Sequence, residues 1–262
     1  MNPLAQTAWS WLQQELDRWS DAGLEASLWW RDDDATRDCD RLQQLFSLSQ
    51  RCQVPLAIAA IPSRLHASLV DAVNKHTQVT VLQHGYTHQN HAAAGELKLE
   101  LGGLRDIQTI SSDLHLGFEQ LDDQFGVQFC PVLVPPWNRI DESVLPRLRE
   151  VGLHGISTYR VCKQQPTDGT ILQVNTHMDP VHWRHNQGFI GVYPAIAILI
   201  QHLLARRTGY RDIAEPTGVL SHHLVYNHAC WQFTEDLFHF LNAHPATRWL
   251  DAHQIWASVI AR

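Results

Sequence analysis

The chain has 262 residues, of which 44% are hydrophobic and 18% charged, a balance typical of a soluble globular protein with a large core. A formal net charge of −7 argues against nucleic acid or an anionic membrane surface as the main partner, since both call for basic patches. Histidine, with 17 residues, and tryptophan, with 10, are unusually frequent, which raises the expectation of metal or proton chemistry only modestly.

The expected compartment follows from the cysteines and from the N-terminus. The five cysteines lie far apart and form no Cys-x-x-Cys pair, which favours a reducing compartment. No basic region leads into an apolar run at the N-terminus, so we expect a cytoplasmic protein without a signal peptide. The most apolar segment, 189–205, is interrupted by Pro194, Gln201 and His202 and is short for a membrane span, so we interpret it as a buried helix.

Short apolar strands alternate with amphipathic helices along the chain. The expected strands are 26–30, 54–61, 79–83, 131–134, 154–157, 171–176 and 218–222. The expected helices are 4–19, a segment around 42–48, 63–75, 96–124, 144–151, 194–207, 231–243 and 252–261. Residues 177–193 are expected to form a long loop over the mouth of the fold. This alternation is typical of parallel βα units, and we predict one α/β domain over 1–262, with 1–22 as an N-terminal helical extension.

Polar clusters follow the expected strands. They lie at 31–34, 84–91, 135–139, 177–183 and 221–223. In an α/β barrel the carboxyl ends of the strands meet at one mouth, so these clusters are expected to come together there.

A pair of histidines follows the third strand in His84-Gly85-Tyr86-Thr87-His88, with His91 three residues on. Two histidines four apart fall on one face of a helical turn, so both imidazoles are expected to reach one ion. Gly85 would let the backbone enter that turn. His91 is either an extra ligand or an ordinary surface histidine.

Three aspartates, Asp32, Asp33 and Asp34, come shortly after the first strand, where like charges crowd one another unless a cation compensates them. Asp32 alone could equally cap a helix. One carboxylate with two histidines leaves an open position for water on a catalytic ion, and a second carboxylate can take the proton from that water. We therefore predict that Asp34 joins the histidine pair as a metal ligand.

Five short motifs in order make the chain resemble the polysaccharide deacetylases of carbohydrate esterase family four, the NodB-homology fold. The motifs are Asp33-Asp34, His84-x-x-x-His88, Pro135-Pro136-Trp137, Asp179 to Trp183, and Leu220-x-His222. The resemblance spans about residues 26–225, and its two metal motifs are specific in combination. It implies a distorted (β/α) barrel of about seven parallel strands.

The resemblance also implies roles for the motif residues. Asp33 would be the general base, and Asp34, His84 and His88 would bind one divalent ion. His222 would be the general acid that protonates the leaving amine. Zinc is the expected ion, although two histidines and a carboxylate suit several divalent metals.

Other residues match the pocket of the family. The backbone N–H of Trp137, after Pro136, would help to hold the oxyanion. Asp179 would tune the acid histidine, while Trp183 and Leu220 would line the pocket.

The chain departs from the family pattern at several positions. Val134 replaces the arginine that steadies the catalytic base, so either Arg31 or Arg139 takes over this role, or the base is held differently. His223 stands where an aspartate is usual, and Ala35 replaces a common glycine.

We therefore predict a metal-dependent hydrolase that removes an N-acetyl group from an amino sugar of a glycan or glycoconjugate. One alternative keeps the site but changes the substrate to a non-sugar, cyclic amide. Another is a non-catalytic carbohydrate-binding relative, for which Val134 is the main support. A weaker hypothesis is that the apolar helix at 194–205 docks a lipid-linked substrate or a partner subunit.

Some aromatic and histidine residues have weaker claims to a role. Trp29, Trp30 and Trp231 could stack on a sugar, although core packing is preferred for Trp29 and Trp231. For the loop histidines His177, His182 and His185 a solvated position is favoured over substrate contact. Asn227 and His228 could line the mouth of the barrel.

Overall fold

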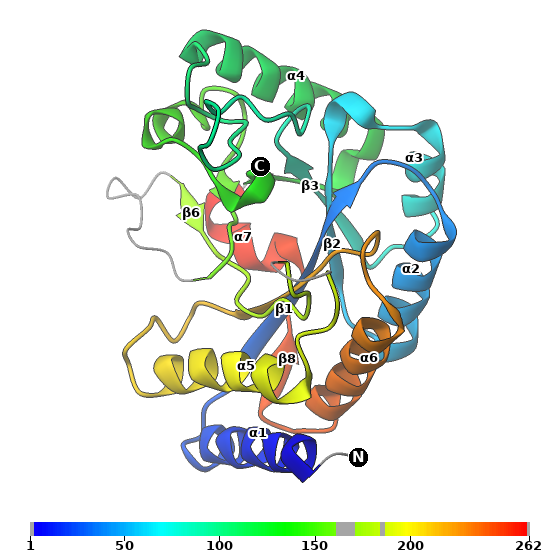
Figure 1. Cartoon of the computed structure of the whole chain (residues 1–262), viewed down its shortest axis with the longest axis vertical. Helices are drawn as coiled ribbons and strands as arrows, with labels where there is room; N and C mark the ends of the chain where they lie inside the picture. The colour runs from blue at the N-terminus through cyan, green and yellow to red at the C-terminus, as the bar shows by residue number, and fades with distance from the viewer. Residues whose placement is uncertain (1–2, 161–170, 184–186, 261–262) are drawn as a thin grey trace.

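The computed structural model describes residues 3–160, 171–183 and 187–260, and its centre is one curled, parallel β-sheet (Figure 1). The strand order is β6-β5-β4-β3-β2-β1-β7, and β8 pairs with the first residues of β1. The strands are β1 (Ala26–Ala35), β2 (Leu56–Ala60), β3 (Val79–His84), β4 (Phe129–Val134), β5 (Gly155–Ile156), β6 (Leu172–Gln173), β7 (Thr217–Ser221) and β8 (Thr247–Trp249). Every pairing between them is parallel, which confirms the prediction of a distorted (β/α) barrel.

Residues 176–178 join the two ends of the curled sheet. Thr176 bridges to Tyr159 beyond β5, and Met178 bridges to Val219 of β7. The N–H of Leu220 completes this connection by donating to the carbonyl of Met178 at 2.8 Å. The beginning of the segment expected as a loop, 177–193, is therefore part of the barrel wall.

Helices pack around the sheet, with the last one against the inner face of the curl. They are α1 (Pro3–Asp21), α2 (Asp40–Cys52), α3 (Ala67–Val73), α4 (Ile107–Phe125), α5 (Val192–Arg207), α6 (His228–Asn242) and α7 (Ala252–Ile260). Figure 1 shows α1 lying along α5, and these two helices pack against each other. In the described residues no helix is both long and apolar enough to cross a membrane.

Three expected helices are wrong in extent, and the one expected over 63–75 consists of a 3-10 turn at Pro62–Arg64 followed by α3. The helix expected over 96–124 begins only at Ile107, because Gly102 and Gly103 adopt φ values of 145° and 71° that a helix does not allow. Asp106 then caps α4 by accepting the N–H groups of Gln108 and Thr109. The helix expected over 144–151 is a short 3-10 turn, Glu142–Arg147, interrupted by Pro146.

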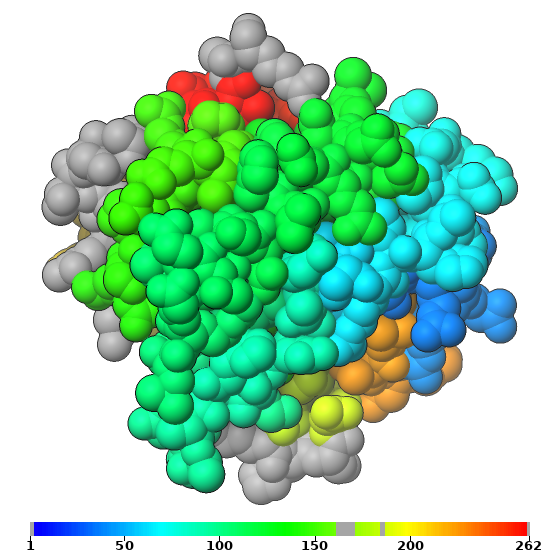
Figure 2. Space-filling model, turned by 90° about the horizontal axis from the view of Figure 1, so that it is seen from above, coloured from blue at the N-terminus to red at the C-terminus, as the bar shows by residue number. Residues whose placement is uncertain are grey.

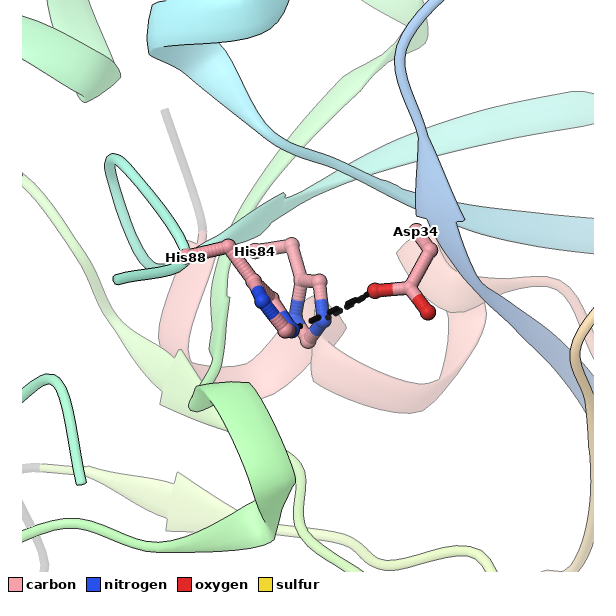
Figure 3. Close-up of side chains that lie close together, drawn as sticks. All are labelled: Asp34, His84 and His88. Carbon is pink, nitrogen blue, oxygen red and sulfur yellow. Dashed lines mark ion pairs between the residues drawn. The ribbon is translucent and has the colours of Figure 1, made fainter. Parts of the chain in front are cut away.

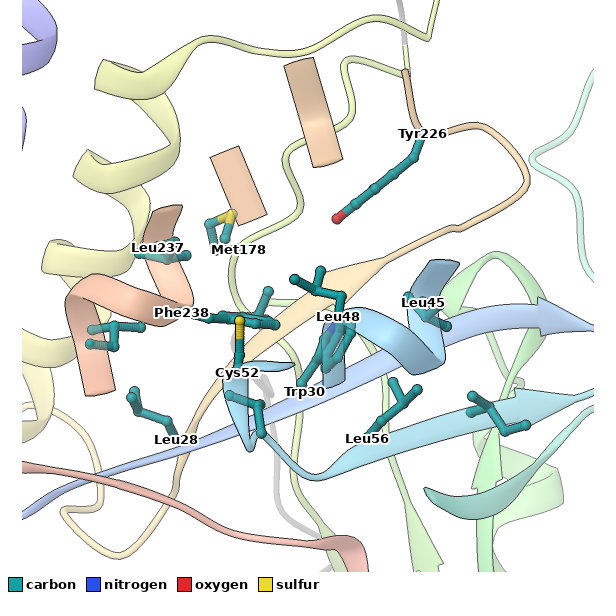
Figure 4. Close-up of a cluster of buried hydrophobic side chains, with 14 of the residues drawn as sticks. Leu28, Trp30, Leu45, Leu48, Cys52, Leu56, Met178, Tyr226, Leu237 and Phe238 are labelled. Carbon is teal, nitrogen blue, oxygen red and sulfur yellow. The ribbon is translucent and has the colours of Figure 1, made fainter. Parts of the chain in front are cut away.

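The hydrophobic core lies on both faces of the sheet. Even-numbered residues of β1, such as Leu28 and Trp30, pack against α2 and α6 in the cluster of Figure 4. Odd-numbered residues face the inside of the curl, where Trp29 meets Trp256 of α7 edge to face. Trp29, Trp30 and Trp231 are all buried, so packing is confirmed for Trp29 and Trp231, and sugar stacking by Trp30 is wrong.

The stretch between β3 and β5 forms much of one face of the molecule. It is coloured turquoise to green in Figure 2, which views the protein from above relative to Figure 1. This stretch contains Glu100 and Trp137, which both contact His88.

Candidate active site

A bulge in β1 places two of its three aspartates, Asp33 and Asp34, at the same mouth. Side chains alternate between the faces of a regular strand, which sends Asp33 into the curl and Asp32 to the opposite face. The register against β2 shifts between Asp32 and Ala35, and Asp34 has a φ of 76°. This irregularity turns the Asp34 carboxylate to the same mouth as Asp33. The strand was expected to end at Trp30, but it carries the aspartates within it.

Asp32 is excluded from the mouth and belongs to a buried polar network. Its Oδ2 accepts the hydroxyl of Ser221 at 2.6 Å and the N–H of His223 at 2.9 Å, and its Oδ1 pairs with Nδ1 of His223. The helix-cap interpretation of Asp32 is therefore wrong. His223, which stands where an aspartate is usual in the family, is the partner of this carboxylate.

The histidine pair comes together without a helix. His84 is the last residue of β3, and His88 follows a non-helical loop with a φ of 56° (Figure 3). Each Nε2 approaches Asp34 Oδ1, at 3.2 Å from His84 and 3.3 Å from His88. The expected helical turn is wrong, but the convergence on Asp34 is present.

The donor set fits a divalent metal ion. Nδ1 of His84 lies 2.8 Å from the carbonyl of Val134, which can only accept, so this nitrogen carries a proton and, in the neutral ring, Nε2 has a lone pair for an ion. Bond lengths of about 2.0–2.1 Å around a tetrahedral zinc place neighbouring ligand atoms roughly 3.3–3.4 Å apart. The two distances to Asp34 match this spacing.

The charges of this group influence one another. Burial alone would raise the pKa of Asp34, but a hydrogen bond with His84 and the charges of the surrounding histidines hold it well below its usual range. Burial opposes protonation of His84, yet Asp34 and Asp33 raise its pKa above the ordinary value. Burial and the neighbouring His84 lower the pKa of His88. Asp34 is thus an ionised ligand candidate at neutral pH.

Arg31 holds Asp33, the candidate base. Its Nε lies 2.8 Å from Asp33 Oδ1, and its Nη2 donates to Oδ2 at 3.0 Å. The guanidinium is completely buried and also donates to Ser157 and Asn138. Arg139 instead donates to the carbonyl of Lys98 at 3.1 Å. Of the two arginines considered for the missing family arginine at Val134, only Arg31 reaches Asp33.

His222 stands between two carboxylates at the end of β7. Its Nε2 lies 3.9 Å from Asp33 Oδ2, and its Nδ1 lies 3.7 Å from Asp179 Oδ2. Trp183 donates its indole N–H to Asp179 at 2.7 Å and packs edge to face on the His222 ring. Burial raises the pKa of Asp179, against the opposing charge of His222.

These groups surround one pocket of about 350 Å³. Its lining consists of Asp33, Asp34, His84, His88, Trp137, Asn138, Arg139, Tyr159, Asp179, Trp183, Leu220 and His222. Trp137, with a φ of 55°, packs its ring on that of His88 at a centroid distance of 4.5 Å. Pro136 is buried and does not line the pocket.

Several weaker candidates lie elsewhere. His91 is not among the three converging metal-ligand candidates, and its N–H donates to the carbonyl of Leu99. Asn227 caps α6 through the N–H of Cys230, and His228 is exposed at the start of that helix. His182 does not line the pocket, and His185 lies outside the described residues.

Two functional features had no clear sequence signal. Glu100 is a buried carboxylate that contacts the loop carrying His88, although it was expected within a helix. His177, expected in a solvated loop, is buried beside His202 and forms with it and the partly exposed Glu215 a second group of potential ligands.

The second group differs from the first in the proton positions of its histidines. The N–H of Gly218 donates to Nδ1 of His177 at 3.0 Å, so the neutral ring must carry its proton on Nε2. That Nε2 faces Glu215 Oε1 at 3.3 Å. His177 therefore presents a proton to the carboxylate, where His84 presents a lone pair, and this group is suited to holding Glu215 in place.

Comparison with known proteins extends the likeness of the fold. No protein-family model and no curated protein sequence matches the chain. A structure from Mycobacterium smegmatis assigned as a polysaccharide deacetylase matches with a TM-score of 0.65 and 18% identity, over 91% of each chain. A family-four acetyl xylan esterase from Clostridium thermocellum, in complex with a cobalt ion, matches at 0.57 and 10% identity, over 88% of this chain and 91% of the other.

A further match is a mutant of a family-four pseudoenzyme with restored enzymatic activity. Its TM-score is 0.56 at 12% identity, over 88% of this chain and 68% of the other. The chain thus has the fold of the family-four polysaccharide deacetylases, as the sequence motifs predicted.

Proposed function

We propose that this chain, on the fold of the family-four deacetylases, is a metal-dependent hydrolase that removes an N-acetyl group from an amino sugar of a glycan or glycoconjugate. The observation that carries the proposal is the meeting of a carboxylate held by arginine, a three-ligand group and a histidine in one pocket. Amide hydrolysis needs an activated water, stabilisation of the oxyanion and an acid for the leaving nitrogen.

The residues that would hold the ion are Asp34, His84 and His88. When bound there, a divalent ion such as zinc would acidify a water molecule and polarise the acetyl carbonyl. Asp33 would accept the proton of the attacking water. Because Arg31 contacts both oxygens of Asp33, the base is fixed in orientation before the substrate arrives.

His222 would donate a proton to the leaving nitrogen. Its ring is close to Asp33 on one side and to Asp179 on the other. The group that would take a proton from water, Asp33, and the group that would give one to the amine, His222, are therefore neighbours in the pocket. The indole of Trp183 limits the rotation of Asp179 and of the imidazole. The backbone N–H of Trp137 is the proposed oxyanion donor.

The pocket wall favours a sugar. Trp137, Tyr159 and Trp183 provide aromatic surface around the polar centre, and aromatic rings combine an apolar face with polar edges that suit a sugar ring. The main support for the non-catalytic alternative was Val134, which stands where the family has the arginine that steadies the base. Arg31 contacts Asp33 in place of that arginine, so this support is lost.

Acetate release by metal-loaded protein from N-acetylglucosamine oligosaccharides, compared with ring opening of small cyclic amides, tests the proposal. We expect acetate from the sugars and none from Asp33→Asn, while Asp71→Asn, an exposed site on α3, behaves as the wild type. Hydrolysis of cyclic amides alone would favour the non-sugar alternative. Sugar binding without turnover would favour the carbohydrate-binding alternative.

A further inference from the structure

We propose that Glu100 is a positioning residue that sets the affinity and geometry of the metal site by holding the loop of His88. This role rests on the metal site of the proposed function. Glu100 does not line the catalytic pocket, and it contacts the site through the backbone of residues 86–88 and the hydroxyl of Thr87.

The Glu100 carboxylate occupies a concave arrangement of donors. Its Oε1 accepts the N–H of Tyr86 at 3.2 Å, the N–H of Thr87 at 2.7 Å and the Thr87 hydroxyl at 2.9 Å. Its Oε2 accepts the N–H of His88 at 3.2 Å. Successive backbone N–H groups that converge in this way form an anion-binding nest, and here the anion is a side chain of the same protein.

The nest requires a carboxylate. Glu100 is completely buried, and among the described residues no lysine or arginine side chain forms an ion pair with it. Burying this charge is tolerated only because hydrogen-bond donors surround it. All of its partners donate, so an amide of the same shape would turn an NH₂ group toward an N–H and lose a bond.

The nest fixes the part of the site that has least support from the sheet. His84 is held by β3 and by its bond to the Val134 carbonyl, whereas His88 lies on the loop in a left-handed conformation, with a φ of 56°. Such a conformation is unfavourable for a residue with a side chain and persists where surrounding contacts impose it. The bond from the His88 N–H to Glu100 is such a contact.

Gly85 shows how tightly the nest is built. A Cβ at this position would lie 2.2 Å from Glu100 Oε2 and 2.6 Å from Pro136, and the φ of Gly85 is +56°. The glycine of the histidine motif therefore admits the carboxylate, instead of starting the helical turn expected from the sequence.

Titration of metal-free protein with Co²⁺ tests the inference, with visible absorption reporting coordination geometry and calorimetry reporting affinity. We expect Glu100→Gln to bind Co²⁺ about 10–100-fold more weakly than the wild type, as for other residues that orient metal ligands, and with an altered spectrum. Glu96→Gln, on the same loop but exposed, is the matched control and should bind as the wild type does.

The outcomes separate this inference from the proposed function. Glu100→Gln protein that unfolds cooperatively and binds Co²⁺ with wild-type affinity and spectrum would overturn the role of Glu100. If that variant does not fold, Thr87→Val takes its place, since it removes one hydrogen-bond donor to Glu100. A several-fold loss of Co²⁺ affinity in Thr87→Val supports the inference, and unchanged Co²⁺ affinity overturns it. Wild-type protein that binds Co²⁺ but hydrolyses no amide would contradict only the proposed function, and absence of Co²⁺ binding would overturn both.

Discussion

Replacing Arg31 by methionine should destabilise the protein strongly, because it leaves the Asp33 carboxylate buried without its cation. Asp33 is 2% exposed and Arg31 is 0% exposed, so water cannot take over the lost contacts without rearrangement. Removing one partner of a buried ion pair typically costs about 3–5 kcal/mol. For a chain of this size each kcal/mol lowers the melting temperature by roughly 2–4 °C, so the expected fall is roughly 6–20 °C.

A double-mutant cycle separates this electrostatic effect from lost packing. Arg31→Met combined with Asp33→Asn removes both charges, so the double variant should recover part of the stability lost in Arg31→Met. Chemical denaturation followed by circular dichroism measures the free energy of unfolding of each variant. The two substitutions should couple by more than about 1 kcal/mol, since they alter atoms in direct contact.

Arg139→Met is the matched control, because Arg139 was the other candidate for the missing family arginine. Its side chain makes one hydrogen bond, to the carbonyl of Lys98, and the expected cost is about 1 kcal/mol or less. Equal destabilisation by Arg31→Met and Arg139→Met, or additive effects of the Arg31 and Asp33 substitutions, would refute the reasoning.

Three further predictions concern the ion, the second histidine group and the acid. Metal analysis by mass spectrometry should find about one divalent ion per chain in the wild type and in His177→Gln, and none in Asp34→Ala. Two ions per wild-type chain would contradict the conclusion that Nε2 of His177 carries a proton and faces Glu215. Burial lowers the pKa of His177 to about 4 in the folded protein, whereas in the unfolded chain it is about 6.5. Between these pH values the unfolded chain binds one more proton than the folded protein does. Stability should therefore fall by up to about 3 kcal/mol as the pH drops through that window, and denaturation at pH 7, 5.5 and 4.5 should show a shallower loss in His177→Gln. Trp183→Phe keeps a ring beside the acid but removes the hydrogen bond to Asp179, so kcat should fall several-fold while the melting temperature changes little; an unchanged kcat would show that this bond does not orient the acid.

The fold was predictable from the sequence because buried parallel strands and amphipathic helices leave regular patterns. The β2 segment, for instance, is an uninterrupted apolar run that is buried along its whole length. The strand β8 was missed, since three residues are too few to show a pattern. The helix expected over 96–124 failed at Gly102 and Gly103, whose backbone conformations outweigh the helical spacing of the leucines.

The meeting of Asp34 with the histidine pair was predictable in its members but not in its geometry. A spacing of four residues is compatible with a helical turn, and it is equally compatible with a loop if something holds that loop. Glu100 holds it, from a segment where helical periodicity was the only local signal. Contacts of this kind depend on the path of the chain in space, and no local pattern reports them.

A departure from a family motif can thus be compensated within the same strand. The arginine expected before Pro135 is absent, and Arg31, two residues before the base it holds, supplies the guanidinium from β1 instead of β4. Residues two apart on a strand point to the same face, so the side chains of Arg31 and Asp33 are neighbours inside the barrel. The residues between and after them then serve other partners: Asp32 binds His223 on the opposite face, and the bulge turns Asp34 to the histidines. One charged tetrapeptide therefore provides the candidate base and its cation, one ligand candidate and a structural anchor: alternation along the strand separates Asp32 from Arg31 and Asp33, and the bulge in β1 turns Asp34 to the histidines.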